Sequence, residues 1–259
     1  MLVGGPLSEA PPLVLLHGFS DTKDSFVDVA REFTDTRRVI LPDLPGFSEA
    51  SQPLDHRYTI PSIAALLMEA LAELAPGGVH LVGNSLGGAI VAFMAAERPG
   101  WVRSLTLVSA AGVPMPVPSA MQRHIEAGHN PFVLRDASEY PGFLRFVLER
   151  MPPLPGPVME AMAHQFVARR AMNEKILDEL VGDDLDLTEQ LSRIDVPTMV
   201  LWGDRDRLMD LSVARVYHRE IRHSRLVILS GIGHAPQVEA PRATARRVRE
   251  TIERGERGA

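Results

Sequence analysis

One serine of this chain lies where a nucleophile is expected. The residues Gly-Asn-Ser-Leu-Gly at 83–87 follow a short apolar run at 79–82 and lead directly into small and apolar residues at 89–96. This order predicts a strand, a sharp turn and a helix with Ser85 at the apex of the turn, the arrangement called a nucleophile elbow. Glycine is needed on both sides because a Cβ in so tight a turn would clash with the neighbouring strand or helix. We therefore predict that Ser85 is a catalytic nucleophile.

A serine hydroxyl reacts poorly until a histidine takes its proton, and a carboxylate must hold that histidine. Asp206 follows the apolar run Thr198–Trp202, and His234 lies in a glycine-containing loop after the last such run, Leu226–Leu229. Loops at the carboxyl ends of parallel strands are where such sheets bind ligands, and the order serine, acid, histidine is the expected one. We expect Ser85, Asp206 and His234 to form a catalytic triad.

Other acids and histidines compete for these roles. Asp204 and Asp210 flank Asp206, and either could be the acid or a solvated loop carboxylate. His80 lies inside an expected strand, and further histidines fall in the middle of the chain or at expected surface positions: His56, His124, His129, His164, His218 and His223. Because no group of histidines and acids has the spacing of metal ligands, we expect no metal, and the triad requires no cofactor.

The reaction also needs hydrogen-bond donors for an oxyanion. The backbone N–H of Leu86, directly after the nucleophile, is one expected donor. The second is expected from the turn after the first central strand, where Gly18 permits a close approach of the backbone, and we assign it to the N–H of Phe19. His17 is expected to brace this turn rather than to transfer protons.

Short apolar runs alternate with amphipathic stretches along the chain, a pattern typical of a parallel sheet covered by helices. Strands are predicted at Leu13–Leu16, Arg38–Leu41, Val79–Val82, Leu105–Val108, Thr198–Trp202 and Leu226–Leu229. Helices are predicted at Ser25–Phe33, Ile60–Leu74, Leu86–Arg98, Leu211–Ile221 and Arg242–Arg254.

The middle of the chain breaks this alternation, because it is rich in proline and methionine and shows only short helical patterns, at Ser138–Glu149 and Val158–Met172. We predict a core formed by residues 1–112 and 194–259 and a helical cap formed by 113–193. Methionine adapts to irregular apolar surfaces, so several methionines are expected either to line a substrate pocket or to fill a small core within the cap. The pocket candidates, together with Asn84, are Met115, Met121, Met159 and Met162.

Composition narrows the class of protein. The chain has 259 residues, a net charge of −6 and no cysteine, which argues against nucleic-acid binding and excludes disulfides and thiolate metal sites. The N-terminal residues lack the pattern of a signal peptide, and no apolar run approaches the ~20 residues of a membrane helix. We expect a cytoplasmic protein without stable membrane insertion.

Taken together, these motifs resemble the α/β-hydrolase superfamily. The resemblance covers about Pro12 to Ile252 and rests on the elbow and on four further motifs: His-Gly-Phe at 17–19, Asp-Leu-Pro-Gly-Phe-Ser at 43–48, Trp-Gly-Asp-Arg-Asp at 202–206, and Gly-His at 233–234 with Glu-Ala-Pro at 239–241. The stretches 16–26, 109–112 and 130–132 are similar to the branch of bacterial lipases and monoacylglycerol lipases. This resemblance implies a cap over the site and ester substrates with an acyl chain.

The chain departs from that family in two places. Residues 1–11 can supply at most the tail of one of the two strands that precede the first strong one, so we expect a shortened sheet of about six strands with Arg38–Leu41 at or near an edge. An exposed edge favours pairing with another chain, which leaves a homodimer open. Asn84 resembles the carbon–carbon-bond hydrolases of aromatic ring cleavage, whereas Phe19 and Ala235 replace the Gly-rich turn and the tryptophan usual in those enzymes.

The expected function is hydrolysis of small carboxylic esters with short to medium acyl chains. A carbon–carbon-bond hydrolase of ring-cleavage dienone products is the alternative, followed by a cofactor-free haloperoxidase or acyl transferase. A binding module that kept the fold without activity should have lost a member of the triad, and all three are present.

Overall fold

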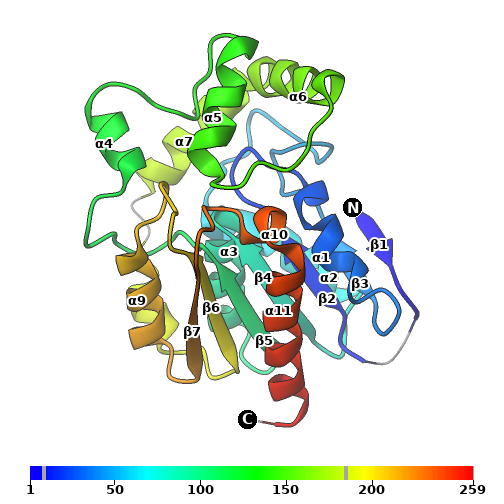
Figure 1. The fold of residues 1–259 in the computed structure, drawn as a ribbon. Coiled ribbons are helices and arrows are strands. Elements are labelled where there is room, and N and C mark those ends of the chain that lie inside the picture. Colours follow the sequence, from blue (N-terminus) through cyan, green and yellow to red (C-terminus); the bar gives the residue numbers. More distant parts are fainter. Residues whose placement is uncertain (8–9, 184–185, 259) are drawn as a thin grey trace.

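A seven-stranded, mostly parallel sheet forms the centre of the computed structural model, which describes residues 1–7, 10–183 and 186–258. The strand order is β1-β3-β2-β4-β5-β6-β7, and only β1 runs antiparallel to its neighbour (Figure 1). The strands are β1 Leu2–Gly4, β2 Leu13–Leu16, β3 Val39–Leu41, β4 Val79–Asn84, β5 Val102–Val108, β6 Thr198–Gly203 and β7 Ser224–Leu229. All six predicted strands are present, and β4, which leads to Ser85, is the central one.

A seventh strand, β1, lies beside β3 in the segment where the sequence left room for the tail of one strand. Leu2 pairs with Leu41 and Gly4 with Val39, so β3 is covered on both sides and lies second from the edge. The sequence contains little sign of β1, because it has three residues and none of them is buried. The edge on this side of the sheet is the three-residue β1, and the opposite edge is the six-residue β7.

Helices cover both faces of the sheet, and the inner strands β3, β2, β4, β5 and β6 are buried on both sides almost throughout. In β2, Val14 and Leu16 point into one hydrophobic core, and Leu13 and Leu15 point into the other, as the alternation of side chains along a strand requires. The first core packs against α2 Ile60–Ala72, α3 Leu86–Glu97, α8 Thr188–Leu191 and α9 Leu211–Glu220. The second packs against α1 Val27–Arg31 and α11 Pro241–Glu256 (Figure 1). The short elements η1 Lys23–Phe26 and α10 Pro236–Glu239 lie close to α1 and α11.

Residues 113–183 form helices above the end of the sheet (Figure 1). They are α4 Ala120–Glu126, η2 Ala137–Glu139, α5 Tyr140–Val147, α6 Gly156–Ala168 and α7 Arg170–Gly182. The helix predicted over 158–172 is two helices, since α6 ends at Ala168 and α7 begins at Arg170. A small separate core forms here around Tyr140, Leu144 and Phe166. The division at 113 and 193 stays a prediction, because Leu187, Leu191 and Ile194 belong to the large core below.

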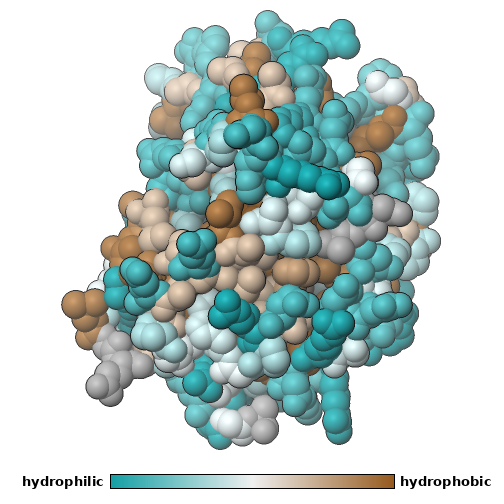
Figure 2. All heavy atoms as spheres, turned by 180° about the vertical axis from the view of Figure 1, so that it is seen from behind, coloured by the Kyte–Doolittle hydropathy of each residue, from teal (hydrophilic) through white to brown (hydrophobic). Residues whose placement is uncertain are grey.

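The exposed apolar side chains include those of the adjacent Met1, Leu2 and Val3. On the face shown in Figure 2, hydrophobic groups gather mainly at the left and in the middle, among hydrophilic ones. Within the described part of the chain, no helix combines the length and the apolar character that crossing a membrane requires.

Candidate active site

Ser85 occupies the turn between β4 and α3 in a strained backbone conformation, with φ 53° and ψ −116°. Such angles are costly for a residue other than glycine and persist only where the surroundings impose them. The Ser85 N–H donates to the carbonyl of Val108 at 3.0 Å, and its own carbonyl accepts from the N–H groups of Ala89 and Ala111 at 3.1 and 3.0 Å. The structure thus has the strand, the turn and the helix in the predicted order.

The glycines around this turn are required by close backbone packing. A Cβ on Gly83 would lie 2.2 Å from the carbonyl oxygen of Gly87, and a Cβ on Gly87 would lie 2.4 Å from that of His17. Both distances are shorter than any real contact, so a larger residue would push the elbow away from the strand or from the turn that follows β2.

Asp206 and His234 form a buried pair close to the elbow. His234 Nδ1 lies 3.0 Å from Oδ1 and 2.9 Å from Oδ2 of Asp206, and the two side chains are 6% and 1% exposed. Oδ1 also accepts from the backbone N–H groups of Leu208 and Met209, both at 2.9 Å. The loop after β6 therefore fixes the carboxylate, and the carboxylate fixes the imidazole.

The two rival acids are used for local structure. Asp204 accepts from the Gly231 N–H at 2.7 Å and from the Ser230 hydroxyl at 3.1 Å, and the Gly231 bond lowers the pKa of its carboxyl. Asp210 is the N-cap of α9 and accepts from the Ser212 N–H at 2.8 Å. Of the three carboxylates, Asp206 is the one that contacts His234.

The turn after β2 is held by the buried His17. Its Nε2 accepts from the Leu44 N–H at 2.9 Å, which leaves Nδ1 to donate to the carbonyl of Gly18 at 2.8 Å. Burial lowers the pKa of His17, so the ring is neutral and braces the turn, as expected. A Cβ on Gly18 would lie 3.2 Å from Ser85 Cβ, which shows how closely this turn approaches the elbow.

Two further side chains, Lys23 and Asn173, hold the same region of the chain, and no sequence pattern predicts these contacts. Lys23 Nζ donates to the carboxylates of Asp43 and Glu49, each at 2.8 Å, and these bonds raise the pKa of the lysine. Although burial acts in the opposite direction, the bonds from Lys23 hold the pKa of Asp43 below its ordinary value. On the other side, Nδ2 of Asn173 on α7 donates to the Ser20 hydroxyl at 2.9 Å.

Asn84 joins the elbow to the histidine loop. Its Nδ2 donates to the carbonyls of Val108 and His234, both at 3.1 Å. The side chain is 3% exposed and borders the cavity described next. Its amide donors are therefore engaged by the backbone, which gives Asn84 a positioning contact to the candidate base.

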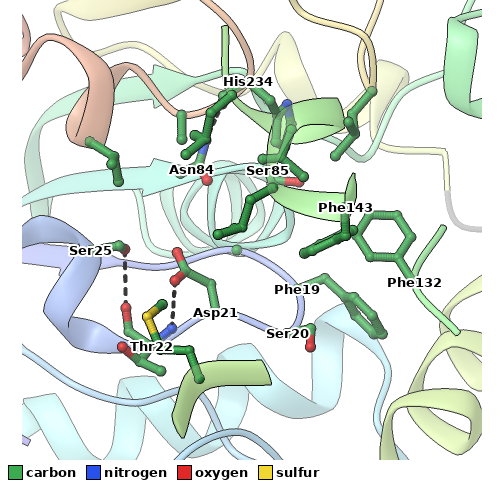
Figure 3. Close-up of a pocket in the computed structure, with 18 of the residues that line it drawn as sticks. Phe19, Ser20, Asp21, Thr22, Ser25, Asn84, Ser85, Phe132, Phe143 and His234 are labelled. Atoms are coloured by element: carbon green, nitrogen blue, oxygen red, sulfur yellow. Dashed lines mark hydrogen bonds between the residues drawn. The ribbon is translucent and has the colours of Figure 1, made fainter. Parts of the chain in front are cut away.

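Ser85, His234 and Phe19 all line one cavity of about 310 Å³ (Figure 3). Of the candidate methionines, only Met162 lines it. Met115 packs against the large core, Met159 packs against the small one, and the Met121 N–H donates to the carbonyl of Arg207. Their places are taken by side chains that the sequence analysis missed, chiefly Phe132, Tyr140, Phe143, Leu144 and Leu154. No spacing pattern marks them, since the cavity is formed by contact between separate helices and loops.

Comparisons with known proteins agree with this geometry. Residues 11–241 match the family model described as the alpha/beta hydrolase fold. Lipase 1 of Psychrobacter immobilis is 31% identical over 237 residues, which cover 90% of this chain and 74% of the lipase. A monoacylglycerol lipase of Xenopus laevis is 26% identical over 253 residues, 93% of this chain and 75% of that protein.

Among solved structures, a bacterial membrane phospholipase A is similar over 99% of this chain and 82% of its own, with a TM-score of 0.95 and 36% identity. The family match, the seven-stranded sheet and the elbow all point to the same conclusion. This chain belongs to the α/β-hydrolase fold family.

Proposed function

We propose that this chain is a serine hydrolase that cleaves carboxylic esters with Ser85 as nucleophile, His234 as base and Asp206 as the acid that holds the base. The observation that carries this proposal is the contact between Asp206 and His234: the imidazole held by this buried carboxylate lines the same cavity as the strained Ser85. The lipases and monoacylglycerol lipases among the relatives support an ester substrate.

The mechanism follows from the hydrogen bonds of the imidazole. Because Asp206 accepts a hydrogen bond from the N–H at Nδ1, the Nε2 lone pair of His234 is available to take the proton of the Ser85 hydroxyl. The serine oxygen then attacks the ester carbonyl, and the resulting oxyanion accepts hydrogen bonds from the N–H groups of Phe19 and Leu86. His234 gives its proton to the departing alcohol, and water, activated by the same ring, releases the acid from the acyl-enzyme.

The volume and the lining of the cavity support the proposal that the substrates have short to medium acyl chains. A volume of about 310 Å³ lies at the low end of the range for ligand pockets, which is about 300–1,000 Å³. The walls are mainly aromatic and aliphatic, as an acyl chain requires.

Asn84 gives the carbon–carbon-bond alternative little support, because its amide donors bond to the backbone of the elbow and the histidine loop. A homodimer and a cytoplasmic location stay predictions.

A labelling experiment tests the nucleophile directly. A fluorophosphonate probe reacts with an activated serine, so wild-type protein should be labelled and should hydrolyse p-nitrophenyl esters fastest at short to medium chain length. Ser85→Ala should abolish both signals. Ser192→Ala, at an exposed serine, is the matched control and should leave both unchanged. Hydrolysis or labelling retained in Ser85→Ala would show that the nucleophile is another residue.

A further inference from the structure

The cavity beside Ser85 contains a carboxyl group that the ester chemistry does not use. Asp21 comes two residues after Phe19, and its side chain reaches into the cavity that Ser85 and His234 border (Figure 3). Its Oδ1 accepts a hydrogen bond from the Thr22 N–H at 2.8 Å. Hydrogen bonding with the Ser25 hydroxyl and the Gly18 N–H also acts to lower the pKa of this carboxyl, so these groups hold it at the wall of the cavity.

No cation among the described residues forms an ion pair with Asp21. The neighbouring Lys23 is engaged by Asp43 and Glu49, and His17 is neutral because its Nε2 accepts from the Leu44 N–H and therefore has no proton. Burial accordingly raises the pKa of Asp21. Asp21 is half-buried, and a carboxyl with a raised pKa at the wall of a cleft, without a cation to pair with, is a candidate for ligand contact.

Asp21 lies on the opposite side of the cavity from an aromatic cluster formed by Phe19, Phe132 and Phe143 (Figure 3). The ring centre of Phe132 is 5.3 Å from that of Phe19 and 5.7 Å from that of Phe143, so the cluster is a continuous apolar wall. Ser85 faces the space between the two sides. An ester bound at Ser85 therefore meets an apolar side and an acidic side.

The charges around the cavity have one sign. Apart from Asp21, the charged residue that lines it is Asp24, which is exposed, and no Lys or Arg lines it within the described ranges. A substrate with a carboxylate would meet like charge here with no cation to hold it, which disfavours its binding.

We propose that Asp21 determines which alcohol is released: its carboxyl accepts a hydrogen bond from a hydroxyl or protonated amine on the alcohol part of the ester. The acyl chain then lies against the aromatic cluster. This inference rests on the proposed ester hydrolysis at Ser85 and adds the chemical class of the alcohol, a hydrogen-bond donor that is neutral or cationic but not anionic.

The proposed role of Asp21 can be tested with four butyrate esters of similar size. Their alcohol parts are butyl, 3-hydroxypropyl, 2-(dimethylamino)ethyl and 2-carboxyethyl. Hydrolysis is followed in a pH-stat at pH 7, and kcat/KM should be highest for the amine and hydroxyl esters and lowest for the carboxylate.

Asp21→Asn removes the charge and keeps an oxygen for the Thr22 N–H. It should lower kcat/KM for the amine ester by about 10-fold to 100-fold, mainly through KM, since a charge-assisted hydrogen bond is lost. The same variant should change the butyl ester by less than about threefold and raise the rate with the carboxylate ester.

Two controls distinguish a change in alcohol specificity from a general loss of fold or activity in Asp21→Asn. Asp28→Asn makes the same charge change at an exposed position of α1 and should preserve the order of the four esters. The fluorophosphonate labelling rate of Asp21→Asn should equal that of the wild type, which shows an intact fold and nucleophile.

The possible failures are distinct. An equal change in kcat/KM for all four esters in Asp21→Asn, or the selective pattern in Asp24→Asn instead, overturns the inference while ester hydrolysis stands. If wild-type protein hydrolyses none of the esters and is not labelled, the proposed function fails and the inference fails with it.

Discussion

Replacing Asp206 by asparagine should stop catalysis by placing the histidine proton on the wrong nitrogen. Oδ1 of Asp206 accepts from the Leu208 and Met209 N–H groups, so the amide oxygen of the substituted side chain should keep that position and its NH₂ should replace Oδ2. That NH₂ would then lie about 2.9 Å from Nδ1 of His234, where it donates a hydrogen bond. Nδ1 must accept this bond, so the proton moves to Nε2, which can no longer take the proton of the serine.

The expected loss is large and confined to the chemical step. An uncharged partner that selects the wrong tautomer costs about 10⁴ in kcat in a serine protease triad, equivalent to about 5.5 kcal/mol. We expect a loss of this order for Asp206→Asn with p-nitrophenyl butyrate, with KM almost unchanged because Asp206 does not border the cavity. Stopped-flow release of p-nitrophenol in a single turnover measures the acylation step directly.

Asp210→Asn is the matched control, because Asn caps a helix about as well as Asp does and the Ser212 N–H keeps its acceptor. It should retain kcat within about twofold. A loss below about tenfold in Asp206→Asn, or a larger loss in Asp210→Asn, would refute the assignment of the acid.

Three further substitutions test the position of the turn after β2 and two contributions to the stability of the fold. Gly18→Ala places a Cβ 3.2 Å from Ser85 Cβ, and displacement of the turn should lower kcat by about 10²-fold, the effect of losing one oxyanion donor, in the same p-nitrophenyl assay. Lys23→Met leaves the buried carboxylate of Asp43 without its cation, and the free energy of unfolding in urea should fall by about 3–5 kcal/mol. Burial lowers the pKa of His80 from 6.5 to about 4, so between these pH values the unfolded chain binds a proton that the folded chain does not, and stability falls as the pH falls. His80→Gln should reduce the stability difference between pH 7.5 and pH 4.5 by about 2–3 kcal/mol in urea titrations, and an unchanged difference would contradict the role of His80.

The central sheet could be predicted from the sequence because its strands are short apolar runs, most of them buried on both faces. Each of the six predicted strands is present. The position of β1 could not be predicted, because its pairing with β3 is made by backbone groups of three residues without a buried side. A pattern of hydrophobic residues contains no information about such a strand.

The residues that line the pocket, in contrast, could mostly not be predicted from the sequence. Methionine content led to four candidates, of which Met162 alone lines the cavity. Phe132 and Tyr140 line it because α5 and the loop before it fold over the elbow, a placement that depends on packing between segments far apart in the chain.

Local patterns of strand, turn and helix were sufficient to identify the family, the elbow and the order of Ser85, Asp206 and His234. The spacing after the strand favoured Asp206 over Asp204 and Asp210. The folded chain adds the contacts that distinguish the three carboxylates, because only that of Asp206 reaches His234 among them. The folded chain also places Asp21 in the cavity without a cation, a property that arises because Lys23 is engaged by other carboxylates.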